Sequence, residues 1–196
     1  KILFNTRRLS SLVSNILLLS KLENQSIQTH REKYALDEQI REDILALESL
    51  WEPKNVEFDV ELDAVRYYGN KNVLHHVWSN LLSNAIKFSP NGGTIKMRLY
   101  KENEKIVFLI EDNGPGIPKE NLPHIFDRFY KVEKAHTPSP QVGSGLGLAI
   151  VKKIIEAHGQ SITVKSARGK GTQFTFTLEK ANTLKRVTDG GRKNGT

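Results

Sequence analysis

The segment from about Asn72 to Phe88 constrains the fold of this chain more than any other. Its apolar residues recur at helical spacing, which predicts an amphipathic helix packed on a core; they are Val73, Val77, Leu81 and Leu82. Polar residues follow each other by four, four and three positions on a second face of the same helix: His76, Asn80, Asn84 and Lys87. A polar stripe on an otherwise buried helix lines either a solvated face or a pocket.

Length and composition place the chain among globular proteins. Its 196 residues leave room for one full domain and a fragment, with 38% hydrophobic and 26% charged residues. The absence of cysteine excludes disulfides, thiolate metal sites and a cysteine nucleophile. No apolar run approaches the roughly 20 residues that span a membrane, and no signal peptide is visible. Since residue 1 is Lys and the only methionine is Met97, we expect a piece of a longer protein.

The basic charge balance is concentrated at the C-terminal end. The net charge is +7, and residues 180–196 set five basic residues against Asp189 in a glycine-rich stretch. We expect residues 181–196 to form a disordered basic tail. Without a base-reading motif in the remainder, we expect no nucleic-acid partner.

A single helix is predicted over residues 2–24, ending at Asn24-Gln25. Its apolar residues spread widely around the cylinder, so the helix needs partners on more than one side, as in a dimerising bundle. The alternative is a helix that packs on its own domain.

Further elements follow from periodicity and from helix and turn signals. We expect an edge strand at 28–35, then a helix capped by Asp37 and closed by Pro53. Its apolar stripe is Ile40, Ile44, Leu47 and Trp51. Five further strands are expected at 56–62, 94–100, 106–111, 161–166 and 172–178. Another helix is expected at 145–157, with Gly159 just beyond its end.

A long connection at 113–145, rich in Gly and Pro, is typical of a lid or binding loop. Phe126, Phe129 and Tyr130 indicate a short helix anchored by aromatic residues. Pro138-Ser139-Pro140 is expected to leave the next stretch extended.

Glycine-rich segments begin and end this connection. Asp112 to Ile117 follows an apolar strand, where glycines allow close approach of a ligand and the carboxylate can accept from an exocyclic amine. An ordinary turn is the alternative. Gly143 to Leu148 opens a helix, where free N–H groups form a phosphate cradle. It matches neither the P-loop nor the dinucleotide motif.

The Asn-bearing helix, the segment from Asp112 to Ile117 and the segment from Gly143 to Leu148 follow one another in this order, and Gly169-x-Gly171-Thr172-x-Phe174 comes after them. Together they resemble the catalytic ATP-binding domain of two-component sensor histidine kinases. The resemblance covers about residues 28–178. The segments correspond to the N box (Asn80 to Phe88), the first glycine box (Asp112 to Ile117), the F box (Ile125 to Tyr130) and the second glycine box (Gly143 to Leu148). Residues 7–23 resemble the end of the second helix of the family's dimerisation and phosphoacceptor bundle.

The resemblance implies an α+β fold, the Bergerat ATP-binding fold: a two-layer sandwich of a mixed sheet against helices, here behind a long N-terminal helix. It implies a bundle helix at 1–25, a catalytic ATP-binding domain at 26–180 and the tail at 181–196. It also implies a cytoplasmic domain whose parent is an inner- or plasma-membrane sensor, although membrane anchorage of the parent stays open.

The implied activity is that of a protein-histidine kinase. The domain would bind ATP and Mg²⁺ and donate the γ-phosphoryl group to a histidine, for relay to an aspartate of a response regulator. Its partners would be that regulator and the phosphoacceptor bundle of the same homodimeric kinase. None of the six histidines stands in the phosphoacceptor motif. We expect His30 in a strand or at the surface, and His75 and His136 at the surface. His76 is expected either to support the site or to be a hydrogen-bonded or solvated histidine outside it.

Roles follow for residues at matching positions. Asn84 would give its amide oxygen to Mg²⁺, and Asn80 would hydrogen-bond phosphate or a metal-bound water. Asp112 would accept from the adenine amine. Lys87 would contact phosphate, and Arg128 and Lys131 would be lid cations for the γ-phosphate. Asn80, Lys87 and Arg128 are thus the catalytic candidates, whereas Phe126 and Phe129 would anchor the lid.

The remaining nucleotide contacts implied by the resemblance come from the boxes and the strand behind them. They are Phe88, Gly114, Gly116, Ile117, Tyr130, Gly143, Ser144, Gly145, Leu146, Gly147, Leu148 and Thr172.

Two other functions compete with this one. Bergerat-type ATPases that hydrolyse ATP resemble one another in having Glu where this chain has Asn80. A carboxylate can act as general base toward water, and an amide cannot. Asn80 therefore favours transfer to an external nucleophile. A nucleotide-binding scaffold without activity is disfavoured because the expected contacts are intact.

Overall fold

The computed structural model describes residues 2–23, 30–132 and 143–179. Several expectations lie outside these ranges: the tail at 181–196, the helix end at Asn24-Gln25, the start of the strand at 28–35, His136, and Pro138-Ser139-Pro140. Both expected domain boundaries, at 25 and 180, also lie outside them.

A five-stranded mixed sheet forms one layer, in the order β2-β4-β5-β7-β6. β2 runs parallel to β4, and the other neighbours are antiparallel. The strands are β2 (Glu57–Leu62), β4 (Thr94–Glu102), β5 (Lys105–Asp112), β6 (Ile162–Ser166) and β7 (Thr172–Glu179). All five predicted strands are therefore confirmed, with small shifts at their ends.

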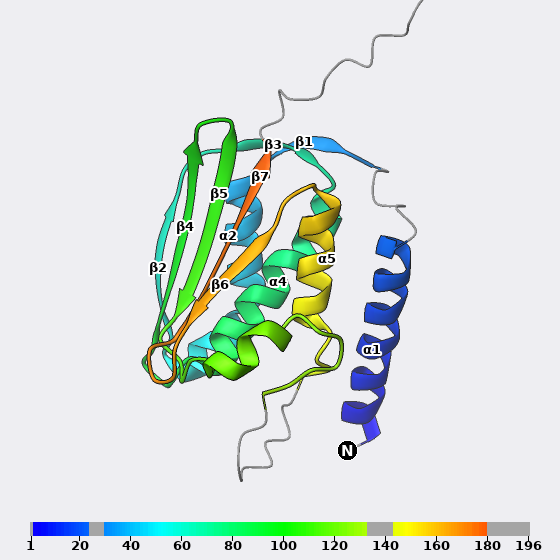
Figure 1. Cartoon of the computed structure of the whole chain (residues 1–196), viewed down its shortest axis with the longest axis vertical. Helices are drawn as coiled ribbons and strands as arrows, with labels where there is room; N and C mark the ends of the chain where they lie inside the picture. The colour runs from blue at the N-terminus through cyan, green and yellow to red at the C-terminus, as the bar shows by residue number, and fades with distance from the viewer. Residues whose placement is uncertain (1, 24–29, 133–142, 180–196) are drawn as a thin grey trace, which may run out of the picture.

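Helices form the second layer, on one face of this sheet (Figure 1). They are α2 (Leu36–Ala46), α4 (Lys71–Phe88) and α5 (Gly147–Ala157). The strands alternate accordingly: in β7, Phe174, Phe176 and Leu178 are buried. The α+β two-layer sandwich is confirmed, and Gly159, at φ 72°, ends α5 as predicted.

Trp78 of α4 stands at the centre of the core. Its ring centroid lies 4.8 Å from that of Phe108 on β5 and 5.6 Å from that of Phe176 on β7. These contacts place α4 over the middle of the sheet. The apolar face predicted for this helix is confirmed, since Val77, Leu81 and Leu82 are also buried.

The N-terminal helix, α1 (Ile2–Glu23), lies outside α5 (Figure 1). Leu19 and Leu22 are buried in the shared core, so the helix packs on its own domain with one side. Apolar residues on its other side are exposed within the described structure; they are Leu9, Val13, Ile16 and Leu17. None of the described helices combines the length and apolar character that crossing a bilayer requires.

The start of the domain differs from the expectation. β1 (Glu32–Ala35) does not border the main sheet but pairs antiparallel with β3 (Arg66–Gly69), a strand that the sequence analysis missed. The predicted cap at Asp37 is wrong, because α2 begins at Leu36 and has no side-chain cap. The Asp37 carboxylate instead accepts from the Val65 N–H at 3.1 Å, which ties α2 to the chain before β3.

The apolar stripe that begins in α2 does not lie on one helix. Ile40 and Ile44 are buried in α2, but the helix ends before Leu47, and α3 (Glu48–Trp51) follows. Pro53 lies inside the 3₁₀ turn η2 (Glu52–Lys54), so α-helix does end ahead of it as expected. Another 3₁₀ turn, η3 (Lys119–His124), lies in the long connection.

The cap of α4 offers a test of local stability. Asn70 precedes the helix, and its side chain accepts from the Val73 N–H at 3.2 Å. We predict that Asn70→Ala lowers the free energy of unfolding by about 1 kcal/mol, measured by urea denaturation. Asn72→Ala, the same change at an exposed position in the first turn, should leave stability unchanged or slightly raised. Equal losses in the two variants would contradict the capping role.

Candidate functional site

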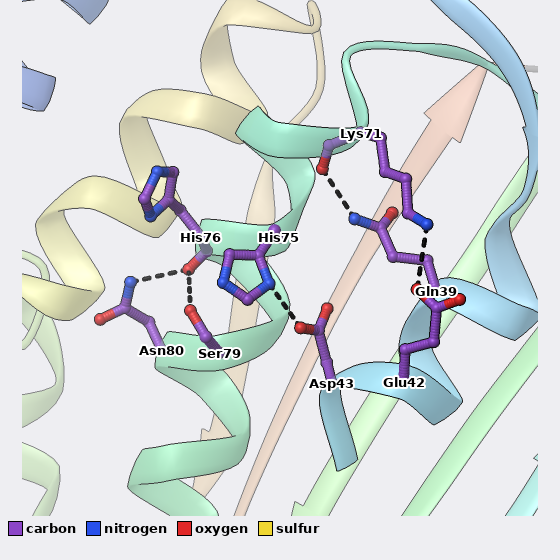
Figure 2. A network of polar contacts seen from close by, with 8 residues as sticks. All are labelled: Gln39, Glu42, Asp43, Lys71, His75, His76, Ser79 and Asn80. Carbon is purple, nitrogen blue, oxygen red and sulfur yellow. Dashed lines mark hydrogen bonds and ion pairs between the residues drawn. The ribbon is translucent and has the colours of Figure 1, made fainter. Parts of the chain in front are cut away.

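The polar stripe of α4 is partly exposed, as predicted for a pocket wall or a solvated face. His76, Asn80 and Asn84 are half-buried, and Lys87 is exposed. Figure 2 shows the Asn80 amide turned back along its own helix, where Nδ2 donates to the His76 carbonyl at 2.7 Å. Because the amide nitrogen is used in this way, the oxygen of Asn80 is the atom that points away from the helix.

The Asn80 oxygen lies against the start of α5. A Cβ added to Gly147 would lie 2.5 Å from Asn80 Oδ1. Gly147 is the first residue of α5, whose first turn carries N–H groups without helical partners. The structure therefore brings the Asn-bearing helix and the second glycine segment together, as the pocket interpretation requires.

The remaining residues of the second glycine segment divide by burial. Ser144 Oγ accepts from the Leu146 N–H at 3.2 Å. Leu146 is fully buried, and Leu148 is partly buried with its side chain packed on the core. At Gly143 an added Cβ would meet nothing within 4 Å. Of the predicted cradle, the open backbone at Gly143 and the α5 start are the parts suited to phosphate.

Asp112 ends β5 with only 7% of its surface exposed. Burial raises the pKa of its carboxyl to about 6, although hydrogen bonds from the Gly114 and Thr172 backbone oppose the shift and Glu111 adds to it. Its Oδ1 accepts from the Gly114 N–H at 2.9 Å. A carboxylate with one oxygen held in this way can accept a further hydrogen bond through the other.

The first glycine segment packs on the end of α4. A Cβ on Gly114 would lie 2.6 Å from the Phe88 carbonyl oxygen. Phe88 is 41% exposed, and Lys87 Nζ lies 5.0 Å from the centroid of its ring. The two ends of the expected nucleotide site, Asn80 and Asp112, are thus connected through one helix.

Gly116 makes a close contact within the protein. It has a φ of 68°, and an added Cβ would lie 1.9 Å from the Ala167 carbonyl oxygen. The Ile117 N–H donates to Ser166 Oγ at 2.8 Å, and that hydroxyl lies 3.0 Å from Thr172 Oγ1. Gly116, Ile117 and Thr172 therefore join protein segments at the end of β6 and the start of β7.

In the long connection the predicted aromatic helix is wrong. The only helical turn described there, η3, comes before the aromatic residues. Phe126 packs against Phe174 with centroids 6.2 Å apart, which confirms it as an anchor. Phe129 does not anchor, because the residue is 59% exposed. Its φ is 63°, and its N–H donates to the Gly145 carbonyl at 2.9 Å. A Cβ on Gly145 would lie 2.8 Å from that Phe129 backbone.

The polar residues of this connection make contacts within the protein. The Tyr130 hydroxyl accepts from Asn121 Nδ2 at 2.6 Å. Arg128 forms an ion pair with Glu23, the last residue of α1. Lys131 is exposed. Arg128 therefore contacts the N-terminal helix here, which periodicity and motifs gave no means to predict.

Sequence reasoning also missed a polar network between α2 and α4 (Figure 2). Asp43 is buried, and its Oδ1 lies 2.5 Å from His75 Nδ1. Gln39 Nε2 donates to the Lys71 carbonyl at 2.7 Å, and Lys71 pairs with Glu42 at 2.9 Å. In the sequence, the only sign of this network is a Gln and an Asp one helical turn apart in the segment that forms α2.

The two adjacent histidines, His75 and His76, differ in their electrostatic surroundings. Burial, and secondarily the neighbouring His75, lower the pKa of His76, so it is neutral near pH 7. His75 is half-exposed as expected, although it is paired. Burial raises the pKa of Asp43, while His75 opposes that shift.

No group of three or more His, Cys, Asp or Glu side chains suited to a metal ion occurs among the described residues. A metal at this site would need amide oxygens and ligand oxygens instead.

Comparison with known proteins agrees with this geometry. Residues 69–182 match the model of the family described as histidine kinase-, DNA gyrase B- and HSP90-like ATPase. The sensor histidine kinase WalK of Bacillus subtilis is 37% identical over 179 residues, which are 88% of this chain and 29% of WalK. The chain thus spans less than two fifths of the length of the first curated relatives it matches.

Solved structures give the same result. The mycobacterial sensor histidine kinase MprB is 30% identical with a TM-score of 0.67, over 77% of this chain and 98% of that one. The histidine kinase ThkA, in complex with the response regulator protein TrrA, is 27% identical with a TM-score of 0.70, over 91% of this chain and 49% of that one.

The contact between Gly147 and Asn80 yields a prediction that separates binding from folding. Gly147→Ala places a methyl group against the Asn80 amide, which must turn away, while the helix itself favours alanine. We expect an unchanged or raised melting temperature together with about tenfold weaker ATP binding in calorimetry. Asn72→Ala, at an exposed position in the first turn of α4, is the control. Unaltered ATP affinity in Gly147→Ala would show that the amide position does not matter.

Proposed function

Since the chain belongs to the histidine kinase-, DNA gyrase B- and HSP90-like ATPase family, we propose that it binds Mg²⁺-ATP and donates the γ-phosphoryl group to a histidine. That histidine would belong to a separate helical bundle of the same kinase. The observation that carries the proposal is the apposition of the Asn80 oxygen and the start of α5 at Gly147.

The phosphate end of the site follows from this apposition. Unpaired N–H groups at the start of α5 favour an anion through both hydrogen bonding and the helix dipole. Lys87 adds a positive charge on the same stripe. Positioning and charge neutralisation are most of what phosphoryl transfer requires of a protein, because its transition state is loose.

The donor set of the stripe fits Mg²⁺. Mg²⁺ prefers oxygen ligands, keeps several waters and bridges phosphate oxygens, so one amide oxygen from Asn84 suffices for the protein. When bound, the ion would neutralise charge on the phosphates. The Asn80 oxygen accepts hydrogen bonds, because its nitrogen is occupied by the His76 carbonyl. We expected Asn80 to bind either a phosphate oxygen or a metal-bound water. An accepting oxygen favours the metal-bound water, which can donate a hydrogen bond.

The base end of the site would be Asp112. An adenine amine donates a hydrogen bond, and the ionised carboxylate accepts it. Phe88, partly exposed at the end of α4, supplies an apolar surface on the same side as Gly114.

Transfer, and not hydrolysis, fits the residue at position 80. The imidazole nitrogen of the acceptor would attack the γ-phosphorus; a P–N bond forms, and the bond to the bridging oxygen breaks as ADP leaves. No proton needs to be removed by the stripe. Arg128, our proposed γ-phosphate ligand together with Lys131, would have to exchange Glu23 for the phosphate.

The partners belong to the whole kinase. We propose that α1 is the end of a bundle helix, since its apolar residues Leu9, Val13, Ile16 and Leu17 are left exposed. ThkA was solved with a response regulator protein, which supports such a regulator as the downstream partner here. The parent protein would be a membrane sensor with this domain on the cytoplasmic side.

The direct test is transfer of ³²P from γ-labelled ATP to the bundle of the same parent protein, supplied as a separate chain. We expect acid-labile label on the bundle and none on this chain. Stable phosphohistidine on this chain alone would contradict the external acceptor. Release of inorganic phosphate without labelled bundle would favour the alternative, a Bergerat-type ATPase.

The raised pKa of Asp112 gives a pH test. Above about pH 7 the carboxyl is ionised and can accept from the base; below its pKa of about 6 it is protonated and donates instead. Adenosine has no phosphate that titrates here. We expect its affinity to be constant at high pH and to fall about tenfold per pH unit well below the pKa.

Asp112→Asn is the control for this titration. It should bind adenosine more weakly and show a flat profile over the same range. A wild-type profile that is also flat would remove Asp112 from base recognition.

A further inference from the structure

We propose that Lys54 is a positioning residue for the base end of the nucleotide site, acting through the last turn of α4. This inference rests on the proposed function. Lys54 lies in η2, far along the chain from every motif of the site, and no side chain in the described structure other than Lys54 is recorded donating to three main-chain carbonyls.

The Lys54 ammonium group binds the end of α4. Its Nζ donates to the carbonyl oxygens of Ile86 and Ser89, each at 2.6 Å, and of Lys87 at 3.2 Å. Helix ends leave their last carbonyls without helical partners, and their dipole favours a positive charge. One ammonium group with three donors satisfies this need and holds the last turn together.

The charge is partly withdrawn from water to make these bonds. Burial lowers the pKa of the Lys54 ammonium group. Hydrogen bonds to a charged donor are stronger than neutral ones, so loss of the ammonium group would leave three carbonyls to find other partners.

The backbone of Lys54 fixes the segment that follows α4. Its carbonyl accepts from the Gly92 N–H at 2.8 Å, and nearby the Glu57 N–H donates to the Gly93 carbonyl at 2.8 Å. The turn that leads from α4 into β4 is therefore joined to the same residue that caps the helix.

The segments fixed by Lys54 are those on which the first glycine segment rests. The Asn113 side chain accepts from the Thr94 N–H at 3.1 Å, just after the turn. Gly114 approaches the Phe88 carbonyl so closely that a Cβ would lie 2.6 Å away. Because Gly114 also holds the Asp112 carboxylate, a displaced last turn of α4 displaces the group proposed to bind adenine.

The consequence reaches the base end of the ligand directly. Asn80 lies two turns before the end of α4, and Lys54 binds carbonyls of the last turn only. Weakening the last turn should therefore reduce the binding of adenosine, which has no phosphate and depends on the base end alone.

The experiment compares Lys54→Met, which keeps the length of the side chain but removes all donors, with Lys101→Met. Lys101 also donates to a carbonyl, that of Ala64 at 3.0 Å, but at a place remote from the site. Adenosine and ATP dissociation constants are measured by NMR titration at a temperature well below each melting point. We expect about tenfold weaker adenosine binding in Lys54→Met and wild-type binding in Lys101→Met.

Two readouts separate positioning from general stability. Adenosine has no phosphate, so its affinity, measured where each variant is fully folded, reports the base end without the Lys87 contact. Lys54→Arg, which keeps a charged donor, should recover adenosine binding. If Lys54→Met does not fold, Lys54→Gln, with one amide donor group, replaces it and should show an intermediate loss.

Unchanged adenosine affinity in a folded Lys54 variant would overturn the inference while leaving the proposed function intact. Equal losses in Lys54→Met and Lys101→Met would overturn it as well. If the wild-type chain binds neither adenosine nor ATP, the proposed function fails and this inference fails with it.

Discussion

The packing of Trp78 against Phe108 and Phe176 is the interaction on which the site depends. Aromatic groups of this size dominate a small core, and this one fixes the rotation of α4 about its own axis. With Trp78 directed at the sheet, Asn80 and Asn84 cannot face the core, and Asn80 lies beside the start of α5. The same rotation brings Phe88 to the first glycine segment. One helix therefore forms both the phosphate end and the base end of the candidate site.

Much of the fold could be predicted because it depends on local patterns. The strands of the main sheet alternate in burial, and α4 and α5 have clear apolar faces, so periodicity located all of them. The predictions were wrong where a local conformation depends on a segment that is distant in the sequence. Asp37 is a residue type that commonly caps helices, but its carboxylate accepts a hydrogen bond from the Val65 N–H. β3 is a short strand whose partner, β1, lies more than one helix earlier.

The site could be predicted as a set of segments but not as a set of contacts. Motif order indicated that the Asn-bearing helix meets the second glycine segment. The amide orientation of Asn80 depends on the His76 carbonyl and on Gly147, which no motif describes. Gly116 and Thr172 match the pattern of nucleotide ligands, and both also make contacts within the protein. The ion pair of Arg128 with Glu23 joins the lid segment to α1, and the hydrogen bonds of Lys54 join the end of α4 to η2. No motif describes either contact.

The central claim is that the polar stripe of α4 forms a wall of a metal-bridged phosphate site. The most direct test compares the Mg²⁺ dependence of ATP binding in wild type and in Asn84→Ala. Calorimetric titrations with Mg²⁺ and with excess chelator give four dissociation constants. The expected result is that Mg²⁺ tightens binding to wild type and has little effect on Asn84→Ala, whose affinity without metal matches that of wild type. An equal Mg²⁺ effect in both proteins would contradict the assignment of the stripe, as would an absence of ATP binding at millimolar nucleotide.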